Sequence, residues 1–68
     1  MTAISKVKQT LATLKGAEST LRIYSLQERD KESRAIYDET YKEISKIKTD
    51  LEKRIGSMEF EEPQYKGN

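Results

Sequence analysis

Apolar side chains recur at helical spacing through the second half of the chain, between Arg34 and Met58. Successive members are separated by 4, 3, 7, 4 and 3 residues, the period of one face of an α-helix. Lys48 stands where the period requires an apolar residue, and Ile47 is expected to fill that gap from the neighbouring position. The pattern predicts one long amphipathic helix, whose stripe consists of Tyr37, Tyr41, Ile44, Leu51, Ile55 and Met58.

An earlier stripe has the same period and predicts a first amphipathic helix. Thr2 is a candidate N-cap for this helix. Ala17 and Tyr24 flank the stripe at the points where Glu18 and Ser25 interrupt it. The apolar members of the stripe are Ile4, Val7, Leu11, Leu14 and Leu21.

The segment between the two stripes, residues 27–32, reads QERDKE and contains no apolar residue. Asp30 is a good N-cap for the second helix, which favours a tight turn at about 28–30. The helices are then expected at about 2–27 and 31–60. Neither Gly nor Pro marks the turn, so one continuous helix remains an alternative.

The length and composition indicate how such helices complete a core. A chain of 68 residues buries only ~60% of the surface that it exposes when unfolded, so a core of its own is marginal. It contains neither Cys nor His, which excludes disulfides and the usual zinc sites as supports. The predicted fold is therefore all-α, an antiparallel two-helix hairpin over residues 1–62 that self-associates, most simply as a dimeric four-helix bundle. The predicted oligomer interface is the two stripes together: Ile4, Val7, Leu11, Leu14, Leu21, Tyr37, Tyr41, Ile44, Leu51, Ile55 and Met58.

A further row on the first helix has two interpretations. Ser5, Ala12, Ser19 and Leu26 are a heptad apart, with Gly16 and Ile23 beside them. This row is either a weakly polar solvent face or a second contact face that lets another backbone approach closely.

On the second helix, i,i+4 pairs of opposite charge predict a solvated outer face. These pairs are Arg34–Asp38, Asp38–Lys42, Lys46–Asp50, Lys48–Glu52 and Asp50–Arg54.

The composition argues against several classes of function. Without His or Cys the usual nucleophile–base pairs are missing, and no Gly-rich phosphate loop is present, so we expect no enzyme activity, no cofactor and no small-molecule substrate. The net charge of +1 is not typical of a nucleic-acid-binding protein. The alternative function, a minor nucleic-acid-associated protein, would use the basic first helix with Lys6, Lys8 and Lys15.

No run of apolar residues is long enough for a membrane span or a signal peptide, so an intracellular location is expected.

Residues 63–68 form a separate tail, because Pro63 disfavours helix at the residue before it. Phe60 and Tyr65 are the aromatic residues of this region. They either fold back onto the open end of the hairpin or belong to a short motif that a partner binds. The candidate partner-binding residues are Phe60, Pro63, Gln64, Tyr65 and Lys66.

Four stretches of the chain resemble a family of small uncharacterised proteins of endospore-forming bacteria, the domain-of-unknown-function family number one-six-five-seven. They are VKQTLATLKGAESTL, the LQ and KE around the turn, DLEKRIGSME and EEPQYKG. The resemblance implies a helical protein of a sporulating bacterium whose genes lie near those of spore membrane proteins. It implies no activity and no site residues. The expected function is therefore a non-enzymatic assembly or adaptor protein of the forespore or spore that docks on a spore membrane protein.

Overall fold

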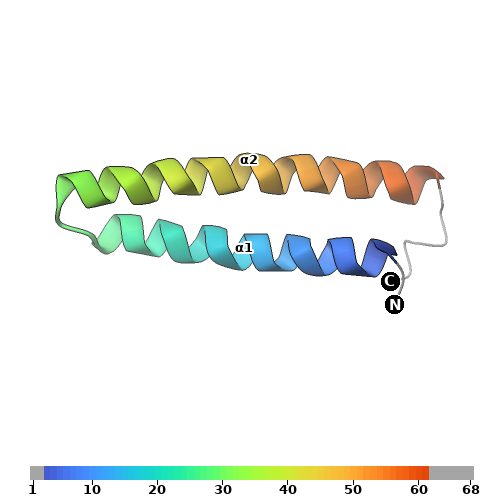
Figure 1. Ribbon diagram of the computed structural model, residues 1–68, viewed down its shortest axis with the longest axis horizontal. Helices are drawn as coiled ribbons and strands as arrows, with labels where there is room; N and C mark the ends of the chain where they lie inside the picture. The colour runs from blue at the N-terminus through green and yellow to red at the C-terminus, as the bar shows by residue number, and fades with distance from the viewer. Residues whose placement is uncertain (1–2, 62–68) are drawn as a thin grey trace.

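The computed structural model describes residues 3–61, and these form two α-helices joined by a short connection. Helix α1 spans Ala3–Gln27 and helix α2 spans Lys31–Glu61. The helices lie side by side and run in opposite directions (Figure 1). The molecule measures 48 × 17 × 13 Å, so it is a single layer of two helices. This confirms the predicted all-α helical hairpin, and no strand occurs within residues 3–61.

Residues 28–30 form the turn, and two carboxylates stabilise it. The Asp30 carboxylate accepts a hydrogen bond from the Ser33 backbone N–H at 2.9 Å, which confirms Asp30 as the N-cap of α2. The Glu28 carboxylate accepts from the backbone N–H groups of Arg29 and Asp30 at 3.0 and 3.1 Å. The chain therefore leaves the helical path here without Gly or Pro. Thr2, the expected N-cap of α1, lies outside the described residues.

The two apolar stripes face each other between the helices, and we call this contact zone, with all eleven stripe residues, the seam. Only Ile4 and Ile55 are buried, with 1% and 7% of their surface exposed. The other nine stripe residues are partly exposed. Two helices in one layer cannot enclose the side chains between them. The hairpin therefore leaves most of its stripe partly in contact with water.

Several expectations about individual side chains are wrong. Ile47 does not fill a gap in the stripe, because 52% of its surface is exposed. Lys48 itself lies in the seam, where it pairs with Glu18 instead of Glu52. Lys46 pairs with Glu43 at i,i+3 rather than with a residue one turn further on. Each of these two lysines thus reaches a partner that the i,i+4 rule does not consider.

Other expected pairs on the outer face of α2 are present. Lys42 lies 3.2 Å from Asp38, and Arg54 lies 2.9 Å from Asp50. Arg34, expected beside Asp38, donates from its Nε to the backbone carbonyl of Glu28. Neither helix, over the residues described, is long and apolar enough to cross a membrane.

Candidate association surface along the seam

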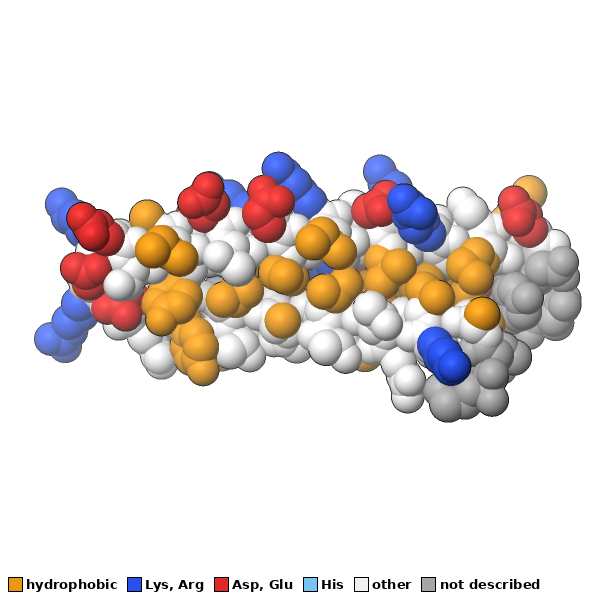
Figure 2. All heavy atoms as spheres, in the orientation of Figure 1, with side chains coloured by type: hydrophobic (Ala, Val, Ile, Leu, Met, Phe, Trp, Pro, Cys, Tyr) orange, Lys and Arg blue, Asp and Glu red, His pale blue; other side chains and the backbone are white. Residues whose placement is uncertain are grey.

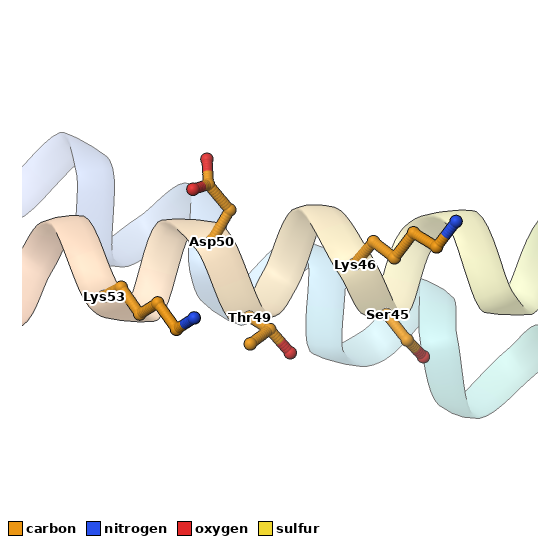
Figure 3. A pocket seen from close by; sticks show the side chains of 5 residues that line it. All are labelled: Ser45, Lys46, Thr49, Asp50 and Lys53. Atoms are coloured by element: carbon orange, nitrogen blue, oxygen red, sulfur yellow. The ribbon is translucent and has the colours of Figure 1, made fainter.

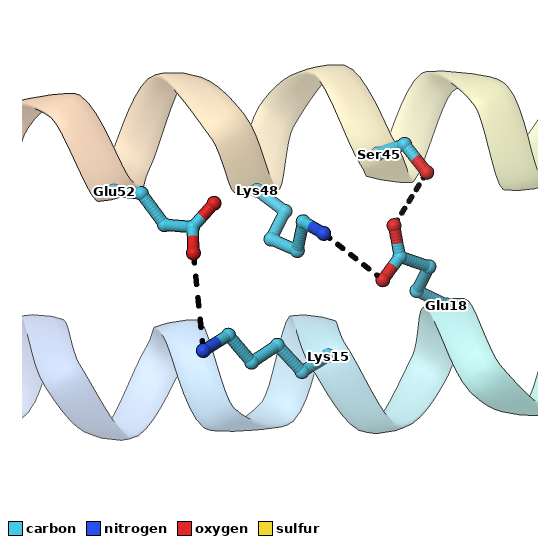
Figure 4. Close-up of polar contacts among 5 residues, drawn as sticks. All are labelled: Lys15, Glu18, Ser45, Lys48 and Glu52. Carbon is cyan, nitrogen blue, oxygen red and sulfur yellow. Dashed lines mark hydrogen bonds and ion pairs between the residues drawn. The ribbon is translucent and has the colours of Figure 1, made fainter.

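A polar layer crosses the middle of the seam. Lys48 Nζ lies 3.2 Å from one Glu18 carboxylate oxygen, and Ser45 Oγ donates to the other at 2.5 Å (Figure 4). The Glu18 and Lys48 side chains are only 16% and 23% exposed. The hydrogen bond from Ser45, followed by the contact with Lys48, holds the pKa of Glu18 below its ordinary value. Glu18 is thus a carboxylate at neutral pH with both oxygens bound.

One edge of the seam carries ion pairs between the helices, and we call it the paired edge. Lys8 Nζ lies 2.9 Å from Glu59 Oε2, and Lys15 Nζ lies 3.8 Å from Glu52 Oε2. Figure 4 shows the second of these pairs beside the polar layer. Lys8 and Lys15 are a heptad apart and so lie on one side of α1, and Arg22 follows after another heptad. Side chains from both helices therefore bridge this edge along much of its length.

Arg22 continues the paired edge toward the turn. Its guanidinium carbon lies 5.7 Å from the centre of the Tyr41 ring, a cation–π geometry. Nearer the turn, and on the other side of the seam from Arg22, the rings of Tyr24 and Tyr37 lie 5.7 Å apart at an interplanar angle of 57°. Tyr24 itself is half exposed, so it covers the seam from the side rather than lying in a core.

The opposite edge of the seam is different, and we call it the open edge. By the heptad register it consists of Thr10, Ala17 and Tyr24 on α1 and of Thr40, Ile47 and Arg54 on α2. Figure 2 shows a face on which hydrophobic side chains form a row along the groove between the helices. Charged side chains gather mainly on the α2 side of that row (Figure 2). A largely uncharged surface beside a partly exposed stripe is the strongest candidate contact surface in the described part of the chain.

The outer face of α1 leaves both interpretations of its small residues open. Ala12, Gly16 and Ser19 are exposed, and a Cβ at Gly16 would have no atom within 4 Å. Ile23 and Leu26 on the same face are exposed as well. Close approach of another backbone at this face therefore stays a prediction.

A shallow depression on α2 is lined by Ser45, Lys46, Thr49, Asp50 and Lys53 (Figure 3). All of these residues come from one helix. Two of them form ion pairs with neighbours on the same helix: Lys46 with Glu43, and Asp50 with Arg54. Within residues 3–61 no group of three acidic side chains is placed to hold a metal ion.

The residues that the sequence suggested as candidate sites differ in their surroundings. Of the eleven residues of the predicted oligomer interface, Ile4 and Ile55 are buried within the hairpin and the other nine are partly exposed, and their contact with a second copy stays a prediction. Phe60 is 86% exposed near the end of α2, and the other tail candidates, Pro63, Gln64, Tyr65 and Lys66, lie outside the described residues. Two of the cations that a nucleic-acid-binding first helix would need, Lys8 and Lys15, are paired with acids of α2.

Sequence reasoning missed the polar layer itself. Glu18 and Lys48 each interrupt a stripe, and their opposite charges were the available signal. In the hairpin these two interruptions lie opposite each other, since Lys48 Nζ is 3.2 Å from Glu18 Oε1.

The comparisons with known proteins give a family but no activity. No curated protein and no solved structure matches the chain. A family model described as "Protein of unknown function (DUF1657)" matches residues 7–55, well over half of the chain. The stretch EEPQYKG lies beyond the matched residues, whereas most of the seam and the whole polar layer lie within them. The chain belongs to the DUF1657 family of proteins of unknown function, as the resemblance of its sequence indicated.

Proposed function

We propose that this protein is a non-enzymatic assembly module whose hairpins associate along the seam into a four-helix bundle. The observation that carries the proposal is the incomplete burial of the seam: only Ile4 and Ile55 of its eleven residues are buried. Burying a Leu or Ile side chain fully contributes ~1.5–3 kcal/mol relative to leaving it exposed. A second hairpin against the seam supplies this burial for several residues at once.

The accessible surface supports the same proposal. The chain exposes 5310 Å², whereas a compact monomer of its mass exposes roughly 4400 Å² by the usual scaling with molecular mass. The excess comes from the elongated single layer, in which each helix has a neighbour on one side only. Association along the length of the hairpin is the arrangement that removes most of this surface.

The biological setting is the second part of the proposal. We place the assembled module in the forespore or spore, as an adaptor that docks on a spore membrane protein. The support is the resemblance to a family of endospore-forming bacteria and the exposed Phe60 just before the C-terminal tail. A pull-down from sporulating cells, with and without residues 61–68, tests this part. Loss of a membrane protein from the truncated sample supports it, and identical captured proteins contradict it.

The test of self-association is the mass in solution by light scattering at low micromolar concentration. We expect the wild type to be a dimer. Ile44→Lys and Leu51→Lys should lower the mass and the helix content together, because each places a cation in the seam and because folding and assembly are linked. A wild type that is monomeric and fully helical would contradict the proposal.

A further inference from the structure

The two edges of the seam differ in what they can still bind. On the paired edge, the carboxylates of Glu52 and Glu59 already contact cations of α1, so a docking surface there would have to displace or desolvate ion pairs. On the open edge no ion pair between α1 and α2 is found over residues 3–61. The open edge is therefore the side from which the partly exposed stripe can be covered at the lower cost.

The hydroxyl groups of the two threonines on the open edge already have hydrogen-bond partners. Thr10 Oγ1 donates to the backbone carbonyl of Lys6 at 3.1 Å, and Thr40 Oγ1 donates to that of Ile36 at 2.8 Å. A buried hydroxyl is costly when its hydrogen bond is missing. Here each of these hydroxyls has its partner within its own helix, so covering it leaves no unsatisfied donor.

We propose that a second copy of the chain docks along the open edge with its turn at the same end of the molecule, so that α1 of each copy packs against α2 of the other. This proposal rests on the proposed self-association and adds which edge is used and how the copies are oriented. The arrangement is two-fold symmetric, with the axis along the helices. It is closed, because each hairpin uses the same surface.

Side-chain size favours this orientation over its alternative. The α1 side of the open edge has Ala17 at its centre, with Thr20 next to it, whereas the α2 side has the bulkier Ile47. Packing α1 against α2 of the second copy sets smaller residues opposite larger ones, as interdigitating cores require. With the turns at opposite ends, each helix would instead pack against its own counterpart.

Charge favours the same orientation. On α2, Glu43, Asp50 and Glu61 lie on or beside the open edge with Arg54 as the one cation, which pairs with Asp50 at 2.9 Å. On α1, Lys6 lies beside the open edge near the start of the helix. With the turns at opposite ends, α2 would pack on α2, and an edge with three acids and one cation would face its own copy. With the turns at the same end, Lys6 approaches Glu61 of the second copy, and the excess of acids on the α2 side faces an α1 side without acids.

The available area is sufficient. The long face of the hairpin measures 48 by 17 Å, or about 800 Å², which is the area that each partner contributes to a standard stable interface. A contact confined to one end of the molecule would not reach this area. The second copy must therefore lie along the whole open edge.

A matched pair of variants tests the choice of edge. Ile47 on the open edge and Ile23 on the outer face of α1 are 52% and 50% exposed in the single hairpin. Ile47→Lys should raise the dissociation constant of the dimer at least tenfold, measured by sedimentation or by light scattering on dilution. Ile23→Lys should leave it within about twofold, because surface substitutions away from such contacts have little effect. Equal effects of the two variants, or no effect of Ile47→Lys on a dimeric wild type, overturn the inference while leaving self-association standing.

The orientation has a separate test that does not perturb the interface. The chain has no Cys, so Arg29→Cys in the turn offers one spin-label site in each copy. With the turns at the same end, the two labels should lie within roughly 25 Å, since packed helices are ~10 Å apart. With the turns at opposite ends, they would lie near the 48 Å length of the molecule, which contradicts the orientation. A monomeric wild type would overturn both this inference and the proposed function.

Discussion

The middle of the seam and the layers beside it hold the helices together in different ways. On either side, apolar residues such as Leu14, Leu21 and Leu51 contribute by losing contact with water, which depends little on direction. In the middle, Glu18 and Lys48 contribute only when both helices are in one register. Apolar layers can be matched again after a shift of one heptad, whereas a polar layer cannot. The apolar layers thus supply stability, and the polar layer specifies the alignment.

The largest effect should come from an apolar layer. Ile55→Ala removes a side chain that is 7% exposed, and such changes in a core cost about 2–5 kcal/mol of unfolding free energy. Ile23→Ala is the matched control, since half of the Ile23 surface is already exposed. Urea denaturation followed by circular dichroism measures both variants. Similar losses of stability would contradict the burial difference between these residues.

Reversing one charge of the polar layer should have the next largest effect. Lys48→Glu sets a second carboxylate beside Glu18 in a seam that is partly shielded from water, so we expect a clear decrease in the melting temperature. Glu18→Lys in the same chain should restore much of the loss, because the pair is then present in the opposite sense. Lys46→Glu, at an exposed site on the same helix, is the control. Failure of the double variant to recover would show that the layer is not a pairwise contact.

Removing the polar character altogether should affect specificity more than stability. Glu18→Leu combined with Lys48→Leu replaces an ion pair by apolar side chains, a change that often leaves stability equal or higher. The seam then keeps only the ion pairs of the paired edge to align the helices, so we expect oligomers of more than one order by native mass spectrometry where the wild type gives one. A single oligomer of the same order as the wild type would show that the turn and the paired edge are enough to set the alignment.

The two helices and the turn could be predicted from the sequence because their signals are local. The 3.6-residue period and the N-cap at Asp30 depend only on neighbours along the chain. The polar layer depends on residues 30 positions apart, Glu18 and Lys48, which no local rule connects. The same limit explains the error at Ile47, since the periodicity of one helix does not show what the other helix brings opposite it. Glu18 lies in the third layer from the turn on α1 and Lys48 in the fourth on α2, so counting layers does not pair them either.

The smallest effect we predict is a dependence of stability on pH below the neutral range. The pKa of Glu18 lies below its ordinary value of 4.5, chiefly through the hydrogen bond from Ser45, and that of Asp30 lies below 3.8 through the backbone N–H of Ser33. A carboxyl whose pKa is lower in the folded than in the unfolded state stabilises the fold above its unfolded pKa, and this contribution is lost as the pH falls through the folded pKa.

Melting temperatures between pH 7 and pH 3 test this dependence with Glu18→Gln as the comparison. At pH 7 the wild type should be more stable than Glu18→Gln, because only the ionised carboxylate attracts Lys48. Below about pH 4 the difference should narrow, since the carboxyl becomes neutral in the wild type too. Glu39→Gln, on an exposed part of α2, controls for the loss of a carboxylate elsewhere. A constant difference between the wild type and Glu18→Gln across the range would mean that the charge of Glu18 does not stabilise the seam and that its shape alone matters.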